Sequence, residues 1–179
     1  AAGRNLDRGF SDFALFEVGQ EFTGVQPGEQ RMAVTGLRQG NQGPRHWRGK
    51  SEQEDVFDAK ADAEAVLAAY GIEADKLQVK REAPDWYHPG RSGVLFRDPR
   101  TPLAVFGELH PEIVKLFGLK GPIVGFEVYP ENLPEPKKKA TRAKSAASLH
   151  SLQALTRDFA FEVASDVAAM DLIKAARGA

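Results

Sequence analysis

Cysteine is absent from this chain. Its absence excludes disulfide bonds, thiolate zinc sites and cysteine nucleophiles, so packing must stabilise the fold. An excess of one charge is also missing, because 24 lysines and arginines face 25 aspartates and glutamates and leave a net charge of −1. Bulk charge therefore provides no general attraction to nucleic acid or anionic lipid, and only a local patch can provide it.

Long apolar runs are missing too. The longest, residues 65–70 and 123–128, are far shorter than the roughly 20 residues that a membrane-spanning helix needs. Residues 1–20 lack the charged start, apolar core and cleavage site of a secretion signal. We therefore expect a soluble, cytoplasmic protein without a membrane partner. With 179 residues, 42% of them hydrophobic, the chain is long enough for one domain, or one domain plus a fragment of another.

Motifs for nucleotide chemistry and hydrolysis are not found either. The chain has no Walker loop, no Gly-x-Gly-x-x-Gly after a strand and no Gly-x-Ser-x-Gly. His88, Glu108, His110 and Glu112 are candidates for a metal site or an acid–base pair. However, His110 and Glu112 are two residues apart and do not share a helix face. We predict no catalytic residue and no metal site, and expect His110 and Glu112 to act at a helix start.

What the sequence does contain begins with two strands. Residues 10–22 alternate apolar side chains on both faces, which predicts a strand buried on most of both sides. A turn at Pro27 and Gly28 follows, and residues 31–37 predict a second strand. The two strands are expected to form an antiparallel pair.

A polar loop and a helix come next. Residues 39–54 are glycine-rich and, apart from Trp47, have too few apolar side chains to fold by themselves. They therefore predict a loop, and one interpretation is that a partner protein completes it. Asp55 or Asp58 then caps a helix, and Gly71 ends it in the left-handed conformation. The apolar positions of that helix recur at helical spacing, and we expect it to cover a sheet with Ala59, Ala63, Val66, Leu67 and Tyr70.

Short strands and turns occupy the middle of the chain. Residues 77–82 predict a short strand, residues 84–93 a turn region, and residues 94–97 and 103–109 a hairpin. Residues 123–129 predict a further strand, with one face formed by Val124, Phe126 and Val128.

A second helix separates the last two of these strands. Residues 110–112 place a proline at its first position and an acid in its first turn, and Gly118 ends it. It is expected to bury Ile113, Leu116 and Phe117. Together these elements predict an α+β fold with a mostly antiparallel sheet flanked by helices.

The composition changes after residue 130. Residues 130–150 pass from a proline-rich stretch to a small, basic one, which indicates a domain boundary. Residues 156–164 then alternate like a strand, and Ser165 is expected to cap a helix with Ala169, Leu172, Ile173 and Ala176 at helical spacing. Because one strand and one helix cannot close a core, we expect a second domain that this sequence includes only in part.

Two groups of residues are candidate binding sites. Residues 86–92, WYHPGRS, place aromatic rings, an imidazole and a guanidinium together and are suited to clamp an anion or a base. The alternative is a structural turn in which Gly90 supplies an unusual dihedral angle and Arg91 pairs with a carboxylate. The basic run after residue 136 is suited to RNA phosphates, with a solvated linker as the alternative; its charged residues are Lys137, Lys138, Lys139, Arg142 and Lys144.

Six segments, in this order, resemble the beta subunit of bacterial phenylalanyl-tRNA synthetase, in its C-terminal part. They cover nearly the whole chain, and they are NLDRGFSDFALFEVGQEF, FDAKADAEAVL, HPGRSGVL, FGELHPEI, FEVYPENLP and LTRDFAFEV, the last followed by an amphipathic helix. The resemblance implies that residues 1–135 form a catalytic-like class II synthetase domain, expected to lack some of its N-terminal region. Residues 136–148 are then a basic linker. Residues 149–179 are the first strand and helix of a truncated ferredoxin-like anticodon-binding domain, and the first strand begins with Arg157 and Asp158.

The resemblance also implies a role without chemistry. The class II pattern Phe-Arg-x-Glu and the glycine-rich strand with its following arginine are not found, and in the family they belong to the alpha subunit. The family's editing pocket and magnesium-binding segment lie N-terminal to this stretch. The implied role is structural support of an alpha subunit in an alpha2-beta2 heterotetramer, which attaches phenylalanine to its tRNA with ATP and Mg²⁺; this fragment itself is expected to bind no cofactor.

Contacts with the alpha subunit or tRNA are expected from His88, Pro89, Gly90 and Arg91 and from the polar loop 39–54. Two alternatives remain open. One is a stand-alone RNA-binding module that acts through the basic linker. The other is a hydrolase that depends on His88 and His110.

Overall fold

A computed structural model describes residues 1–44, 46–47, 49–135, 146, 152–153 and 155–178. The chain divides into two units, residues 1–138 and residues 139–179. Each unit is described by itself below.

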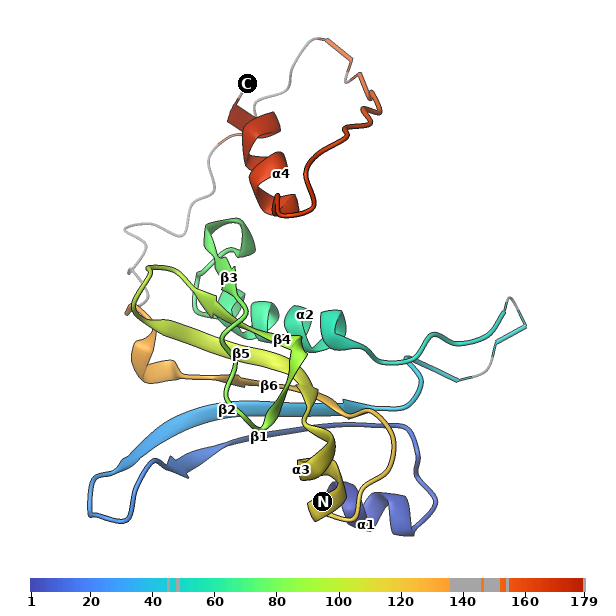
Figure 1. The fold of residues 1–179 in the computed structure, drawn as a ribbon, viewed down its shortest axis with the longest axis vertical. Helices are drawn as coiled ribbons and strands as arrows, with labels where there is room; N and C mark the ends of the chain where they lie inside the picture. Colours follow the sequence, from blue (N-terminus) through green and yellow to red (C-terminus); the bar gives the residue numbers. More distant parts are fainter. Residues whose placement is uncertain (45, 48, 136–145, 147–151, 154, 179) are drawn as a thin grey trace. The chain divides into compact units, whose positions relative to one another are not determined.

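The first unit is built on a six-stranded antiparallel sheet in the order β1-β2-β6-β5-β4-β3 (Figure 1). The strands are β1 (Phe13–Phe22), β2 (Gln30–Gln39), β3 (Gln78–Lys80), β4 (Tyr87–Phe96), β5 (Pro102–Leu109) and β6 (Val124–Val128). The helices of this unit are α1 (Ala2–Asp7), α2 (Val56–Ala69) and α3 (Pro111–Leu116), with short 3₁₀ turns η1 (Ala74–Lys76) and η2 (Pro130–Asn132). The α+β fold predicted from the sequence is confirmed.

Helix α2 starts and ends as its sequence dictates. The Asp55 carboxylate accepts the backbone N–H groups of Phe57 and Asp58, and the Asp58 carboxylate accepts the backbone N–H of Asp55 at 2.7 Å, which completes a capping box. Gly71 follows with φ +82°, a left-handed conformation that favours glycine. Both predicted boundaries are confirmed.

The main core lies between α2 and the centre of the sheet. Helix α2 packs on β5 and β6 and makes a smaller contact with β2. Its buried face consists of Ala59, Ala63 and Leu67, three of the five predicted positions, whereas Val66 and Tyr70 are half-buried. The sheet contributes the side chains that face α2, and the fully or nearly buried ones are Leu95, Leu103, Ala104, Phe106, Val124, Phe126 and Val128. A second, smaller core covers the other face at Tyr87, Val94, Phe96, Val105 and Tyr129.

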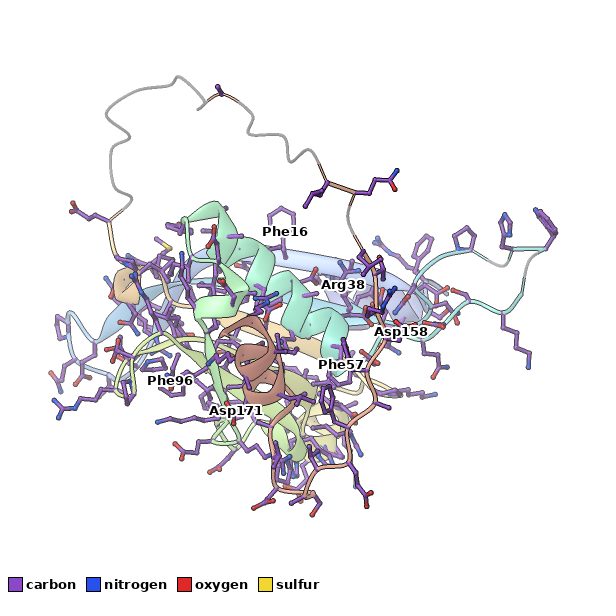
Figure 2. The ribbon with its side chains drawn as sticks, turned by 90° about the horizontal axis from the view of Figure 1, so that it is seen from above. Phe16, Arg38, Phe57, Phe96, Asp158 and Asp171 are labelled. Carbon is purple, nitrogen blue, oxygen red and sulfur yellow. The ribbon has the colours of Figure 1, made fainter. Side chains whose placement is uncertain are left out.

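The first strand forms where it was predicted, but its predicted burial is wrong. β1 pairs with β2 along its whole length and lies at the edge of the sheet. Because α2 covers β5 and β6, the side chains of Phe16 and Val18 stay exposed on the same face. Figure 2 shows Phe16 on the blue strands, outside the area that α2 covers.

Helix α3 is also less buried than predicted. It starts at Pro111 and stops before Gly118, whose φ is +65°, as expected. Leu116 and Phe117 are exposed, however, and Val114 is buried instead. The physical reason is that Ile113 and Phe117 line a cavity of about 520 Å³, bounded in part by α1 and β1, so they face open space where a packed neighbour was expected.

In the second unit the predicted helix forms but the predicted strand does not. α4 (Ala169–Gly178) includes the expected apolar positions. Residues 155–164 are not in a strand, because no described strand pairs with them, and Phe159 and Phe161 are exposed. Ser165 lies in a turn ahead of the helix, so it is not the cap. The linker 136–148 lies outside the described residues, Ala146 excepted.

Candidate interaction site at the β4 bulge

Residues 88–91 form a bulge within a strand, whereas the sequence predicted a turn between strands. Tyr87 pairs with Leu109 and Ser92 pairs with Gly107, so residues 88–91 stand opposite Glu108 alone. Pro89 has no N–H to donate to the ladder, which favours such an irregularity. We call residues 88–91 the β4 bulge.

Short-range hydrogen bonds hold the β4 bulge in shape. The Gly90 N–H donates to His88 Nδ1 at 3.0 Å, and the Ser92 hydroxyl donates to the His88 carbonyl oxygen at 2.6 Å. Gly90 is not among the glycines with positive φ. The predicted unusual dihedral angle at Gly90 is therefore wrong.

Arg91 is fixed by a two-point ion pair with Glu108. Arg91 Nε donates to Glu108 Oε2 at 2.6 Å and Nη2 donates to Oε1 at 2.9 Å, which is the parallel geometry that makes such pairs strong and directional. The bond to Glu108 raises the pKa of the Arg91 guanidinium. Half of the Arg91 side chain stays exposed beside a cavity of about 750 Å³, where Lys115 and Lys120 also lie. The alternative that Arg91 pairs with a carboxylate is confirmed.

Glu127 is the centre of a network that the sequence did not reveal. Its Oε1 accepts Trp86 Nε1 at 2.8 Å and the Tyr87 hydroxyl at 3.1 Å, and its Oε2 accepts the Tyr129 hydroxyl at 3.1 Å. The only hint was a carboxylate between Phe126 and Val128, alternating with two buried side chains. We call these four residues the Glu127 network.

The network keeps both of its tyrosines protonated. Burial and the neighbouring Glu127 carboxylate raise the pKa of Tyr87 well above its usual value of 10.0, and the same causes raise the pKa of Tyr129. On the outer side, the Arg31 guanidinium lies 3.7 Å from the centre of the Tyr129 ring and pairs with Glu21. Together with Arg31, the network therefore connects β4, β6 and β2 through groups that already have partners.

The two histidines of the hydrolase alternative have structural contacts. His110 caps α3, since its ring Nδ1 accepts the backbone N–H of Glu112 at 3.3 Å. The backbone N–H of His110 donates to the Trp86 carbonyl oxygen at 2.8 Å. The predicted helix-start role of His110 and Glu112 is confirmed. Within the described ranges no group of three or more histidine, aspartate or glutamate side chains could hold a metal ion.

The polar loop 39–54 projects from an anchored stem (Figure 1). At its base, Arg38 Nη2 donates to Asp62 at 2.9 Å and Nη1 donates to Glu54 at 3.2 Å. Gln42 Nε2 donates a hydrogen bond to the Asp58 carboxylate at 3.0 Å, which connects the loop to α2. Further out, Trp47 is largely exposed. The predicted loop is confirmed, although residues 45 and 48 lie outside the described part.

The predicted RNA-contacting residues Lys137, Lys138, Lys139, Arg142 and Lys144 all lie outside the described residues. Their role stays a prediction. Among the helices that the structure describes, none is long and apolar enough to cross a membrane.

Comparison with solved structures identifies the class of fold. The chain superposes on a pyrrolysyl-tRNA synthetase from Desulfitobacterium hafniense with a TM-score of 0.52 over 73% of this chain and 44% of that one. The sequence identity is 19%, so the likeness concerns the fold alone. The antiparallel sheet with its covering helix is thus of the class II aminoacyl-tRNA synthetase type.

Sequence comparison identifies the family within that class. Residues 1–129 match the model of the phenylalanyl tRNA synthetase beta chain CLM domain, and the chain belongs to this family. Over all 179 residues it is 49% identical to phenylalanine–tRNA ligase beta subunits of Paramagnetospirillum magneticum and Ruegeria pomeroyi. The chain spans 22% of the length of each of these relatives.

Proposed function

We propose that this chain is a non-catalytic assembly portion of a phenylalanine–tRNA ligase beta subunit, which supports the alpha subunit in the ATP-dependent attachment of phenylalanine to tRNA. The observation that carries the proposal is the family match over residues 1–129 on a synthetase-type sheet. A fold can keep its shape and serve as an interaction surface after its chemistry has moved to a partner.

The chemistry of the described side chains favours an assembly role. Glu127 accepts three hydrogen bonds from neutral donors, Glu108 is paired with Arg91 at two points, and Arg38 is shared by Asp62 and Glu54. Such closed pairs stabilise shape, whereas a catalytic acid or base must be able to exchange a proton with a substrate. We accordingly place ATP and Mg²⁺ in the complete assembly, outside this chain.

The proposed organisation has three parts. Residues 1–135 are the catalytic-like domain, residues 136–148 are the linker, and residues 149–179 are the start of a ferredoxin-like anticodon-binding domain. Compatible with this, the chain divides at residues 138 and 139, and α4 is the only helix of the described part of the second unit. In the assembly we place two alpha and two beta subunits, with tRNA as substrate, in the cytoplasm.

The proposed contact with the alpha subunit or tRNA is the β4 bulge together with the polar loop 39–54. Arg91 is half exposed and held by Glu108, so it presents an ordered guanidinium without loss of side-chain freedom on binding. Trp47 offers an exposed ring of the type that often anchors interfaces.

An Arg91→Ala substitution in the complete enzyme tests this contact. We expect phenylalanylation of tRNA to fall at least about tenfold, which corresponds to the loss of one charge-assisted contact. The matched control is Arg81→Ala, which removes an exposed arginine outside the bulge. Unchanged assembly and unchanged aminoacylation in Arg91→Ala would remove the bulge from the interface.

The absence of chemistry has its own test. The 179-residue chain alone is expected to support no phenylalanine-dependent exchange between ATP and pyrophosphate, while the complete enzyme does. Exchange by the isolated chain, surviving repeated purification, would overturn the non-catalytic assignment.

A further inference from the structure

The base of the polar loop 39–54 gathers three carboxyl groups around one cation. A cavity of about 280 Å³ lies there, and its polar lining residues are Arg38, Gln42, Glu54, Asp58 and Asp62. Among these described residues Arg38 is the only cation, and Asp62 and Glu54 share its guanidinium. If all three carboxyl groups are ionised, three negative charges and one positive charge leave a net charge of −2. The cluster then has more negative charge than its own cation balances.

Glu54 is the carboxyl group of this cluster that lacks a hydrogen bond. Its side chain is 8% exposed, against 29% for Asp62. Its Oε1 accepts Arg38 Nη1 at 3.2 Å. In the described part of the chain, its Oε2 is one of two buried side-chain atoms without a hydrogen-bond partner, and the other belongs to the neutral amide of Gln39. A buried carboxylate oxygen without a donor costs free energy, so Oε2 requires a donor or a proton.

Asp58 is the acceptor beside Glu54. The two carboxyl groups lie within hydrogen-bonding reach of each other. The Asp58 oxygens already accept the backbone N–H of Asp55 at 2.7 Å and Nε2 of Gln42 at 3.0 and 3.1 Å. An ionised carboxylate has about four acceptor positions, so Asp58 has room for a further donor. A proton on Asp58 would compete with its existing hydrogen bonds, whereas a proton on Glu54 gives Oε2 the partner that it lacks.

We propose that in weakly acidic solution Glu54 holds a proton that it shares with Asp58, and that this proton holds the polar loop 39–54 on α2. Glu54 Oε2 then donates to the Asp58 carboxylate, while Oε1 still accepts Arg38. The net charge of the cluster changes from −2 to −1, and a hydrogen bond from O–H to an ionised carboxylate is one of the strong kinds. When the proton leaves to solvent at higher pH, two carboxylates face each other and the loop is held less firmly.

The surroundings of Glu54 favour the protonated form. The charged groups that face it come from two elements, Arg38 from β2 and Asp58 and Asp62 from α2. Burial is the largest cause that raises the pKa of Glu54 above its usual value of 4.5; Arg38 opposes the rise, and the charge and hydrogen bond of Asp58 add to it. Ionisation of Glu54 therefore weakens the folded arrangement, and this cost grows as the pH rises from 4.5 through the folded value.

The result is a pH-dependent attachment of the loop. The inference does not rest on the proposed function, since it follows from the contacts at the base of the loop alone.

Carbon NMR of the 179-residue chain, labelled in its glutamate carboxyl groups, detects the proton directly. The Glu54 resonance is assigned by its loss in Glu54→Gln, and its titration midpoint is expected above the usual value of 4.5. In Asp58→Asn the midpoint is expected to fall, because the neighbouring negative charge is gone; circular dichroism shows that this variant is folded. A midpoint at or below 4.5 would mean that a water molecule supplies the donor to Oε2, and a midpoint that is the same in Asp58→Asn would mean that Asp58 does not share the proton. Either result overturns the proposal.

Amide hydrogen exchange measures the attachment of the loop. The reporters are the N–H groups of residues 42 and 54, which donate to the carbonyl oxygens of Glu52 and Gly40 across the base of the loop. Their protection, relative to an unstructured peptide, is expected to be about fivefold lower at pH 8 than at pH 5.5, the effect of one hydrogen bond. Glu54→Gln keeps an oxygen for Arg38 and offers an N–H to Asp58 at every pH, so its protection is expected to stay high and nearly constant.

The matched control is Glu52→Gln, which removes an exposed carboxylate of the same loop outside the cluster. It is expected to keep the pH response of the parent chain. A parent chain that is equally protected at both pH values would overturn the proposal. So would a Glu54→Gln variant that loosens with pH as the parent does, because another titrating group would then cause the response. A response that is lost in Glu52→Gln would assign it to the total charge of the loop and overturn the proposal as well.

Discussion

Val128 and Val18 lie in one row of the sheet, through Val34 between them, yet their surroundings are opposite. Val128 is 0% exposed under α2, whereas Val18 on the edge strand is 59% exposed. Both strands alternate in the same way and both form. The comparison teaches that the sequence pattern decides the strand, while the neighbouring element decides whether the strand is buried. It also leaves the β1 edge with more apolar surface than its own chain covers.

The largest expected effect lies on the covered side of this comparison. Leu67 of α2 is fully buried against the sheet, so Leu67→Ala leaves a cavity and is expected to lower the free energy of unfolding by about 3 kcal/mol. Urea unfolding followed by circular dichroism measures it. A loss below about 1 kcal/mol would mean that α2 does not hold the centre of the sheet as described.

Arg38 links α2 to β2, between the two regions. Arg38→Ala is expected to cost about 1–2 kcal/mol at pH 7, because it leaves the Glu54 carboxylate mostly buried without its cation. Burial already raises the pKa of Glu54, and Arg38 opposes that rise.

The pH dependence of this variant has a definite sign. A raised carboxyl pKa means that the folded state holds the proton more tightly, so ionised Glu54 destabilises the fold above that pKa and the cost disappears as the pH falls through it. Arg38→Ala should therefore lose less stability, relative to the parent chain, at pH 4 than at pH 7. An equal loss at both pH values would assign the effect to packing instead.

Tyr87→Phe tests the other face of the sheet, in the smaller core at the Glu127 network. Removing one donor to Glu127 is expected to cost about 1 kcal/mol. Because the folded-state pKa of Tyr87 is raised, its stabilising contribution is fully present below the usual value of 10.0 and is lost as the pH rises from there towards the folded value.

Denaturant unfolding between pH 8 and 11 shows this loss in the parent chain. The Tyr87→Phe variant should lose stability less steeply over the alkaline part of this range. The control is Tyr70→Phe, at a half-buried tyrosine that follows α2. Identical alkaline slopes for the parent and Tyr87→Phe would contradict the proton-holding role of the network.

The smallest effect is expected on the open edge. Phe16→Ala removes a large ring, but the ring is exposed, so the free energy of unfolding of the monomer is expected to change by no more than about 0.5 kcal/mol. Urea unfolding of Phe16→Ala and Leu67→Ala under the same conditions gives the two losses of unfolding free energy. Their difference measures how much more the covered side chain stabilises the fold than the exposed one. A loss as large as that of Leu67→Ala would show that β1 is buried in solution.

Much of the fold follows from local sequence signals. The aspartates at the start of α2, the proline at the start of α3 and the glycines after both helices act within one turn, and each of these predicted boundaries is confirmed. Burial was harder to predict, since Phe16 and Phe117 have the spacing of core residues but no element packs over them. Residues 156–164 alternate like a strand, yet a strand needs a neighbour to pair with.

The candidate site was predicted in its residues but not in its shape. The proline and glycine of the β4 bulge indicated a turn, and only pairing with β5 shows that the segment interrupts a strand. Arg91 and Glu108 are far apart in the sequence and meet because β4 and β5 are neighbours. Glu127 was missed because its partners come from β4, from the residue that precedes β4 and from the residue that follows β6.

The central claim is that this chain is an assembly portion of a ligase, and co-purification with the alpha subunit tests it most directly. The tagged 179-residue chain and the alpha subunit of the same organism are expressed together and isolated through the tag, with a Leu67→Ala chain as a destabilised control. The account predicts that the alpha subunit is retained by the folded chain and lost with the control. A folded chain that retains no alpha subunit would contradict it.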